Sequence, residues 1–409
     1  MRWAAVMGLC VACGGATGGD TAGGTGGEEQ ASSSGEAGST APGETTEGLD
    51  SSSGEPDEDE SCFDEEWSWS AELSSSHAVA IAHGEKTALL DTGGGRVRLS
   101  AFDADGSLVF EPELVGNGYR GDVAAGPNDE WWLVTRADDG DHLLRRSSQG
   151  VALADHLVTP TNEPGGLWSI AVTPNGNAVL GGSVPDKTSG QTRLLGVDDD
   201  GTVQWEYDGF DDTVHEIEID PDGTIFAMTI AVGIEGGDVS VLSLEPDGTF
   251  VWSFLAGSHG GFGDERMSPF GLGLDGNGGF VTVGAEPGAR IRVAPWHTPN
   301  VLTERYDGAA QREWRTEAAL TGTDALPMAG AVTRVGELGF VAVVNGSMPT
   351  LVLLDLDGTP RCQRRLSEEL SIGSVVATSG DTVVVAGGKR DESGSSRTWV
   401  AQFRAFADR

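Results

Sequence analysis

The stretch that decides the fold is residues 168–205, which reads WSIAV (168–172), TPNG (173–176), AVLGG (178–182), TRLLGV (192–197), DDDG (198–201) and TVQW (202–205). Four short apolar or β-branched runs are separated by turn residues, and none shows the 3.6-residue spacing of a helix. The Asp-Gly pair at the last turn supplies the positive φ that a tight hairpin needs. The stretch therefore predicts a four-stranded antiparallel unit.

The same unit recurs along the chain at intervals of roughly 44 to 60 residues, which is the spacing of β-propeller blades. A turn between the third and fourth strands marks six complete copies, at Gly106, Gly150, Gly201, Gly248, Gly308 and Gly358. A seventh copy begins at Ser371, and the chain stops before its fourth strand.

The missing strand has a counterpart at the start of the repeat region. Residues 62–69 read CFDEEWSW, and Trp67 and Trp69 resemble the tryptophans of the other fourth strands. Pairing the two ends would complete the seventh blade and remove an open sheet edge, which is an aggregation liability. We therefore expect an all-β fold in residues 62–409, a seven-bladed β-propeller whose last blade is completed by an N-terminal strand.

Cys62 and Cys362 are predicted on the fourth strands of the last blade and of the blade before it. In an oxidising compartment such a pair tends to be bridged, and a bridge would staple the ends of the domain. Neighbouring outer strands do not by themselves bring two Cα atoms within about 7 Å. The bridged and the free states both stay open at this point.

The N-terminal part differs from the rest. Residues 1–12 have the order of a signal peptide, with a charged start and a short apolar run. The run resembles a bacterial lipoprotein signal, which implies export and lipidation of Cys13. Residues 13–61 are rich in Gly, Ser, Thr and Glu and almost free of large apolar residues, so we expect a disordered tether. The resemblance implies a lipid-anchored protein of the bacterial cell envelope, at the outer membrane or cell surface, which meets the membrane only through its lipidated N-terminus.

Charge and motif content limit the chemistry. The formal net charge is -39, which argues against nucleic acid as a partner because few groups could neutralise phosphates. The Asp-x-Asp-Gly runs lack the remaining ligands of an EF-hand, so they are interpreted as turns, with weak surface Ca²⁺ binding as the alternative. The sequence holds no zinc spacing and no nucleophile elbow. It therefore predicts no metal site, no catalytic group and no cofactor.

Three segments carry a family resemblance: residues 194–205, 257–266 and 275–284. The first resembles the repeat unit of bacterial surface propellers, and the other two resemble that family's connector and middle hairpin. The chain is more distantly similar to pyrroloquinoline-quinone-type propeller repeats. Gly201 and Trp205 keep one interval of that repeat, but the spacing from Asp198 is short and the motif's Lys is missing, which weakens the implied quinone cofactor.

Candidate binding residues come from aligning the copies. Arg120, Trp168, His215 and Phe270 fall at or near one point of different blades, where the inner strand opens at the axial mouth. Convergence on one face is what a central ligand site requires. The alternative is that these side chains cap blade edges. Outer-strand tryptophans are interpreted as interblade packing rather than as a carbohydrate-stacking set.

These observations favour a non-enzymatic, surface-tethered binding or interaction propeller with an unknown protein or glycan partner. One alternative is an enzyme with its site at the axial mouth, namely a hydrolase, a lyase or a quinoprotein oxidoreductase. Another is an envelope-assembly scaffold. The fold cannot choose among these because propellers support both binding and catalysis.

Overall fold

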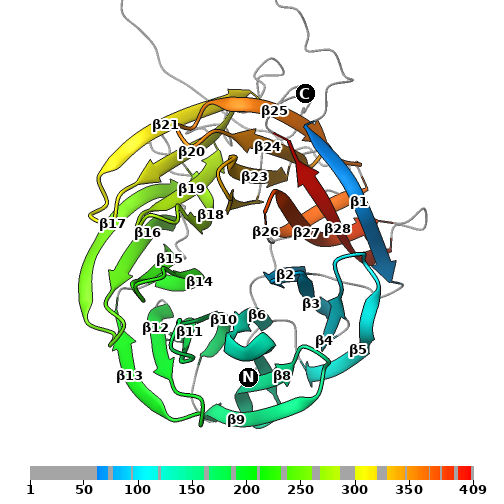
Figure 1. Cartoon of the computed structure of the whole chain (residues 1–409). Coiled ribbons are helices and arrows are strands. Elements are labelled where there is room, and N and C mark those ends of the chain that lie inside the picture. Colours follow the sequence, from blue (N-terminus) through cyan, green and yellow to red (C-terminus); the bar gives the residue numbers. More distant parts are fainter. Residues whose placement is uncertain are drawn as a thin grey trace, which may run out of the picture. The chain divides into compact units, whose positions relative to one another are not determined.

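The computed structural model describes residues 62–71, 77–93, 95–117, 121–160, 165–185, 190–209, 212–231, 237–259, 268–285, 300–319, 329–345, 348–367, 369–377, 380–390 and 395–406. These residues form strands and one short 3₁₀ helix, η1 (Pro127–Asp129). The strands build seven four-stranded antiparallel sheets arranged around an axis (Figure 1). The expected seven-bladed propeller is therefore confirmed. In the described part of the chain, no helix has the length and apolar character needed to cross a membrane.

The blades follow one another along the chain, each from its inner to its outer strand. Blades 1 to 3 contain β2 (His77–His83), β3 (Lys86–Gly93), β4 (Arg96–Phe102), β5 (Leu108–Asn117); β6 (Gly121–Gly126), β7 (Glu130–Ala137), β8 (Gly140–Ser147), β9 (Ala152–Pro160); and β10 (Gly166–Val172), β11 (Ala178–Pro185), β12 (Gly190–Val197), β13 (Val203–Asp208). Blades 4 to 6 contain β14 (Asp212–Ile219), β15 (Ile225–Ala231), β16 (Gly237–Leu244), β17 (Phe250–His259); β18 (Ser268–Leu274), β19 (Phe280–Ala285), β20 (Asn300–Tyr306), β21 (Arg312–Ala319); and β22 (Ala329–Val335), β23 (Gly339–Asn345), β24 (Thr350–Leu354), β25 (Pro360–Arg365).

Blade 7 joins the two ends of the domain. Its inner strands are β26 (Leu370–Ala377), β27 (Thr382–Arg390) and β28 (Ser396–Ala405), and its outer strand is β1 (Phe63–Ala71). The pairing of β1 with β28 runs from Phe63 opposite Ala405 to Ala71 opposite Thr398. Figure 1 shows the blue β1 beside the red β28. The predicted closure of the ring by an N-terminal strand is therefore correct.

The core consists of apolar layers between neighbouring blades. Side chains on one strand alternate between the two neighbours, as the two-residue period of a strand requires. In β27, Val383 and Val385 belong to the layer against blade 6, whereas Val384 and Ala386 belong to the layer against blade 1. Each second strand is therefore buried on both faces, which explains its continuous apolar sequence.

The turns between third and fourth strands close as predicted, with one difference. In blade 1, the Gly106 amide donates to the Asp103 carbonyl, and Gly106 has a φ of 80°. In blade 5 the equivalent hydrogen bond runs from the Ala310 amide to the Asp307 carbonyl, and Ala310 has a φ of 58°. The left-handed residue of this turn is therefore Ala310 rather than the predicted Gly308.

Replacing Ala310 with glycine is expected to raise the free energy of unfolding by about 1 kcal/mol, because a Cβ at positive φ is strained and glycine is not. Chemical denaturation of both proteins measures the change. Ala309→Gly, one residue earlier, is the matched control and is expected to give no gain. Equal gains from both substitutions would contradict the assignment.

Tryptophans on the outer strands of blades 7, 3, 4 and 5 connect each of these blades to the next, and we call this arrangement the indole–turn contact. The indole N–H donates to a carbonyl in the third turn of the following blade at 2.9 Å for Trp67, 3.1 Å for Trp205, 3.0 Å for Trp252 and 3.1 Å for Trp314. At Gly106, Gly248 and Gly358 an added Cβ would collide with the ring of Trp67, Trp205 and Trp314, respectively. The interpretation of these side chains as interblade packing is therefore borne out.

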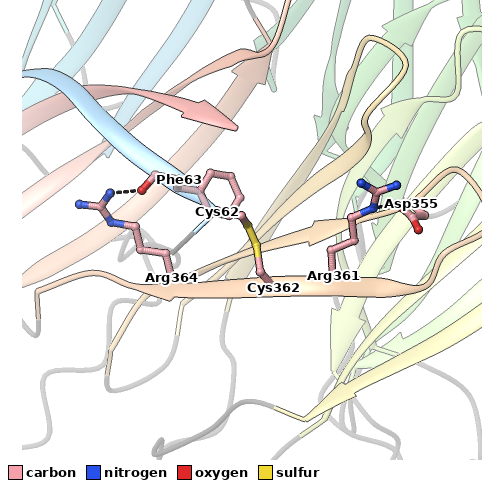
Figure 2. Close-up of a disulfide and its surroundings, with 6 residues drawn as sticks. All are labelled: Cys62, Phe63, Asp355, Arg361, Cys362 and Arg364. Carbon is pink, nitrogen blue, oxygen red and sulfur yellow. Dashed lines mark hydrogen bonds and ion pairs between the residues drawn. A yellow bond between two sulfur atoms is a disulfide. The ribbon is translucent and has the colours of Figure 1, made fainter. Parts of the chain in front are cut away.

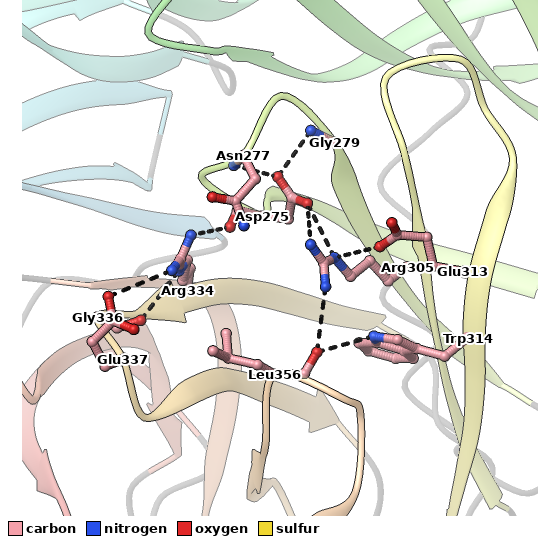
Figure 3. Close-up of polar contacts among 10 residues, drawn as sticks. All are labelled: Asp275, Asn277, Gly279, Arg305, Glu313, Trp314, Arg334, Gly336, Glu337 and Leu356. Atoms are coloured by element: carbon pink, nitrogen blue, oxygen red, sulfur yellow. Dashed lines mark hydrogen bonds and ion pairs between the residues drawn. The ribbon is translucent and has the colours of Figure 1, made fainter.

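Figure 3 shows the indole–turn contact between blades 5 and 6. Trp314 and Arg305 both donate to the Leu356 carbonyl, at 3.1 and 3.5 Å. Arg305 also pairs with Asp275, whose second oxygen caps the turn after β18 by accepting the amides of Asn277 and Gly279. The contact thus joins the third turn of blade 6 to the first turn of blade 5.

The disulfide takes the place of this contact between blades 6 and 7. Cys362 lies at the register position that Trp314 holds in blade 5, directly after a bulge in the outer strand. Blade 7 has no third turn, because its outer strand comes from the other end of the domain. Cys362 is instead joined to Cys62, which directly precedes β1, with 6.2 Å between the Cα atoms (Figure 2). Arg364 adds a hydrogen bond to the Phe63 carbonyl.

Candidate functional site

Four inner strands each have a β-bulge, at the same height along the propeller axis. The pairing with the second strand shifts by one residue at Trp168 in β10, at His215 in β14, at Phe270 in β18 and at Gly373 in β26. All four lie in the first half of their strands, at the same axial end. Because a bulge re-aims side chains and is common beside active sites, this end of the axis is the candidate functional site.

Glycines opposite the bulges make room for them. In blades 3, 5 and 7 the residue before the bulge pairs with Gly182, Gly284 and Gly387. At Gly182 an added Cβ would collide with the Gly166 carbonyl. The Gly-Gly and Val-Gly endings of these second strands are the sequence signal for the bulges.

Three of the four predicted site residues fall on these bulges. The Trp168 indole donates to the Val214 carbonyl at 2.7 Å, so its ring is held between β10 and β14. His215 directly follows Val214 in β14 and is exposed. Phe270 holds the equivalent strand position in blade 5. Arg120 and the lipidation candidate Cys13 lie outside the described residues.

Two of the inner-strand residues that directly follow the height of the bulges are acidic, and sequence reasoning did not select them as site residues. Asp122 and Glu216 occupy equivalent positions on the inner strands of blades 2 and 4, and Ser169 holds that position in blade 3 between them. Asp122 accepts the Ile170 amide at 3.0 Å, and Glu216 accepts the Leu272 amide at 2.7 Å. Each carboxylate thus bridges its blade to the inner strand of the next.

A third carboxyl, that of Glu218, lies on the same face of β14 as Glu216 and has no hydrogen-bond partner among the described residues. All three acidic side chains keep some solvent contact, yet protein surrounds each carboxyl group. Burial raises the pKa of Asp122 to about 6 and that of Glu218 to about 7, where the Asp122 charge adds to the effect. Burial, and then the charge of Glu218, raises the pKa of Glu216 well above its usual range.

We call Asp122, Ser169, Glu216 and Glu218 the axial carboxylate cluster. Its acids come from blades 2 and 4 and influence one another's pKa across blade 3. Arg334, at the far end of β22, is the one Lys or Arg on the described inner strands of blades 2 to 7. The cluster therefore holds protons at neutral pH that it can release to a base or exchange for a cation.

The raised pKa values predict that the protein loses stability as the pH rises. The folded state holds the Glu218 proton more tightly than the unfolded chain, so stability is full below the ordinary pKa of 4.5 and falls as pH passes about 7. Between pH 4.5 and 8 we expect a loss of about 2 kcal/mol from Glu218, after allowance for its solvent contact.

Glu218→Gln is expected to remove that part of the pH dependence, as measured by urea denaturation at a series of pH values. Glu245→Gln changes an exposed acid in the turn between β16 and β17 and is the matched control. A Glu218→Gln profile that coincides with that of the unmodified chain would contradict the raised pKa.

Comparison with solved structures supports the fold and leaves the chemistry open. A catalytically inactive virginiamycin B lyase from Staphylococcus aureus, in a structure with quinupristin, is 12% identical with a TM-score of 0.54, over 84% of this chain and 100% of that one. A streptogramin B lyase is 12% identical with a TM-score of 0.51, over 83% and 97%. YCF48 from Cyanidioschyzon merolae is 13% identical with a TM-score of 0.50, over 84% and 99%. At these identities the likeness shows the propeller fold alone.

No protein-family model matches the chain, and no curated protein matches it.

Proposed function

We propose that this chain is a binding propeller that takes an organic cation at the axial carboxylate cluster. The observation that carries the proposal is the mutual electrostatic influence of three partly buried acids on the inner strands of blades 2 and 4, with Ser169 of blade 3 between them and no Lys or Arg on the described inner strands of these three blades. A bound cation would favour ionisation of all three carboxyl groups, which burial now opposes.

At the axial carboxylate cluster, an organic cation fits better than a metal ion. The described residues contain no group of three or more His, Cys, Asp and Glu side chains that could hold a metal. Trp168 places an indole ring at the same axial end, and an ammonium group gains energy over such a ring. An amine, a quaternary ammonium compound or a Lys side chain of a protein partner has the required charge.

We further propose that the propeller acts outside the cytoplasm, lipid-anchored through Cys13 and held away from the membrane by the segment 13–61. This setting follows from the lipoprotein-like signal in the sequence. It makes a cationic protein partner or an amino-substituted glycan the natural occupants of the site. Globomycin treatment of producing cells tests the anchor, because it is expected to leave the signal peptide uncleaved.

The ligand proposal is tested by thermal unfolding of the purified chain with probes of different charge. Spermidine, choline and Nα-acetyl-lysine amide are the cationic probes, glucose and cellobiose are neutral, and citrate is anionic. At least one cationic probe is expected to raise the melting temperature saturably, and Glu216→Gln and Glu218→Gln are expected to abolish the shift. Glu245→Gln is the control and is expected to keep it.

Shifts from neutral sugars alone would replace the cation with a neutral glycan. An equal cation shift in Glu218→Gln and in the unmodified chain would place binding elsewhere on the acidic surface and overturn the proposal.

A second candidate function is acid–base catalysis at the same place, such as that of a hydrolase or lyase. The observation in its favour is the pair of acids with pKa values of about 6 and 7, which suits a general base and a general acid at neutral pH. Turnover of an ester, lactone or glycoside panel that is lost in Glu218→Gln and in His215→Ala would establish this candidate. Binding of an unchanged ligand would exclude it for that ligand.

A further inference from the structure

A second group of acidic and hydroxyl side chains lies far from the described carboxylate cluster, in the layer between blades 7 and 1. Asp91 of β3 is only 1% exposed, and neither of its carboxylate oxygens has a hydrogen-bond partner among the residues that the structure describes. Buried carboxylates are normally paired or hydrogen-bonded, because an isolated buried charge is costly. Asp91 is therefore an exception to this rule, and a bound ligand would account for it.

The strand period places Asp91 on the face toward blade 7. Its neighbour two residues earlier, Leu89, belongs to the apolar layer between these blades, together with Val384 and Val400. Burial raises the pKa of Asp91 to about 6, and the charge of Arg98, its cross-strand neighbour, acts in the opposite direction without forming an ion pair with it. The guanidinium therefore leaves both carboxylate oxygens unbonded.

Two buried hydroxyl groups without a hydrogen-bond partner face the same layer. Ser100 pairs with Leu89 and so lies diagonally across from Asp91, at a typical separation of about 7–8 Å. Thr398 of β28 lies two residues before Val400, on the face toward blade 1, and is fully buried. Its hydroxyl is also unbonded.

The heights of Asp91 and Thr398 agree. β3 and β27 both follow turns with a glycine at positive φ, Gly84 and Gly380, so Asp91 lies at the level of Gly387. The next residue, Gly388, pairs with Thr398 and offers no side chain to fill the layer. Asp91 and Thr398 thus face each other from the two blades at nearly one height.

The other blades show that the carboxylate is special to this layer. Alignment of the second strands puts Thr135, Gly182, Thr229, Gly284, Val344 and Gly387 at the position of Asp91. The threonines have partners: Thr135 donates to the Val115 carbonyl at 3.4 Å and Thr229 to Asp212 at 3.0 Å. The repeat therefore does not need an acid at this position for its fold.

We propose that Asp91, Ser100 and Thr398 form an internal site for a small inorganic cation between blades 7 and 1. All the unbonded atoms are oxygens, one pair is anionic, and hard cations such as Ca²⁺ and Na⁺ take oxygen ligands of this kind. An anion fits this place less well, because Arg98 is the one positively charged group that the described residues could offer it there. The cation would link the two blades that meet where the ring closes, at the inner side of the β1–β28 pairing.

The site is tested on the full chain after dialysis against a chelator into tetramethylammonium buffer at pH 7.5. Thermal unfolding is followed during separate titrations with CaCl₂, MgCl₂, NaCl and KCl, and metal content is measured by elemental analysis. One of these cations is expected to raise the melting temperature saturably by about 2–5 °C. The shift is expected to vanish in Asp91→Asn and in Asp91→Thr, which carries the residue of blades 2 and 4.

Asp200→Asn, which removes an exposed acid in the turn between β12 and β13, is the matched control and is expected to keep the shift. Absence of any saturable shift in the unmodified chain would overturn the proposal. A shift of equal size in Asp91→Asn would also overturn it, because the ion would then bind to the acidic surface. If Asp91→Asn fails to fold, Ser100→Ala and Thr398→Val must weaken the shift, and an unchanged shift in both contradicts the site.

Discussion

Cys362→Ser is expected to lower the free energy of unfolding by about 4 kcal/mol. The disulfide to Cys62 closes a loop of 300 residues, so its removal frees the unfolded chain of a large constraint, and native disulfides typically contribute 2–5 kcal/mol. The folded state also loses the covalent link that replaces the indole–turn contact between blades 6 and 7. Guanidinium denaturation under non-reducing conditions measures the change.

The double variant Cys62→Ser/Cys362→Ser is the matched control. It is expected to lose no more than the single variant, because either change removes the whole bridge. Reduction of the unmodified chain should reproduce the same loss and leave the variants unaffected. Peptide mapping without reductant is expected to recover residues 62 and 362 in one linked fragment. Separate fragments, or equal stability of the oxidised and reduced protein, would contradict the bridge.

Phe63→Ala is expected to cost about 3–5 kcal/mol. Phe63 begins β1 and is fully buried in the layer between blades 6 and 7, among Val383, Val385 and Phe403. Removal of a buried phenyl ring loses its transfer free energy and leaves a cavity. Because β1 alone closes the sheet of blade 7, the loss also weakens the attachment of the ring's two ends. Urea denaturation measures the effect.

Val203→Ala on the exposed side of β13 is the control, with 42% of Val203 exposed, and is expected to change stability by about 0.5 kcal/mol or less. Hydrogen exchange of β28 adds a local readout: Phe63→Ala should speed exchange in Val400–Ala405 more than in β13. A Phe63→Ala protein as stable as the Val203→Ala control would contradict the closure by β1.

The blade count was predictable because the turn chemistry is local. The hairpin turns at Gly106 and Gly201 are specified by residues within four positions of one another, so a pattern in the chain is enough to place them. The closing strand was predictable for a related reason, since Trp67 repeats the tryptophan that three of the six complete copies carry on their fourth strand, at Trp205, Trp252 and Trp314. The disulfide remained open because interblade distance is a property of the assembled ring.

The axial carboxylate cluster was not predictable from any single repeat. An acid on an alternating strand normally faces solvent, so Glu216 and Glu218 looked like ordinary surface residues. Their carboxyl groups are buried only in the assembled ring, which also brings Asp122, two blades earlier, close enough to raise their pKa values through its charge. A signal was present, however: inner strands of this chain are mostly small and apolar, and β14 departs from that pattern with Asp212, His215, Glu216 and Glu218.

Asp91 went unnoticed for the opposite reason. The run Leu-Leu-Asp-Thr in β3 ends like a strand entering a turn, where Asp is common. Only the position of Leu89 in the layer against blade 7 shows that Asp91 is inside the protein. The two acidic sites thus differ in setting, since one keeps solvent contact at the axis and the other is enclosed between blades.

The measurement that most directly tests the axial site as a cation site is the count of protons released on ligand binding. Calorimetric titration of the best amine probe at pH 7, in two buffers of different ionisation enthalpy, gives that number. Release of about one proton per ligand is predicted, because the cation lowers pKa values that burial has raised. The release should fall in Glu218→Gln and persist in Glu245→Gln. Binding without proton release, or with the same release in Glu218→Gln, would contradict the proposed site.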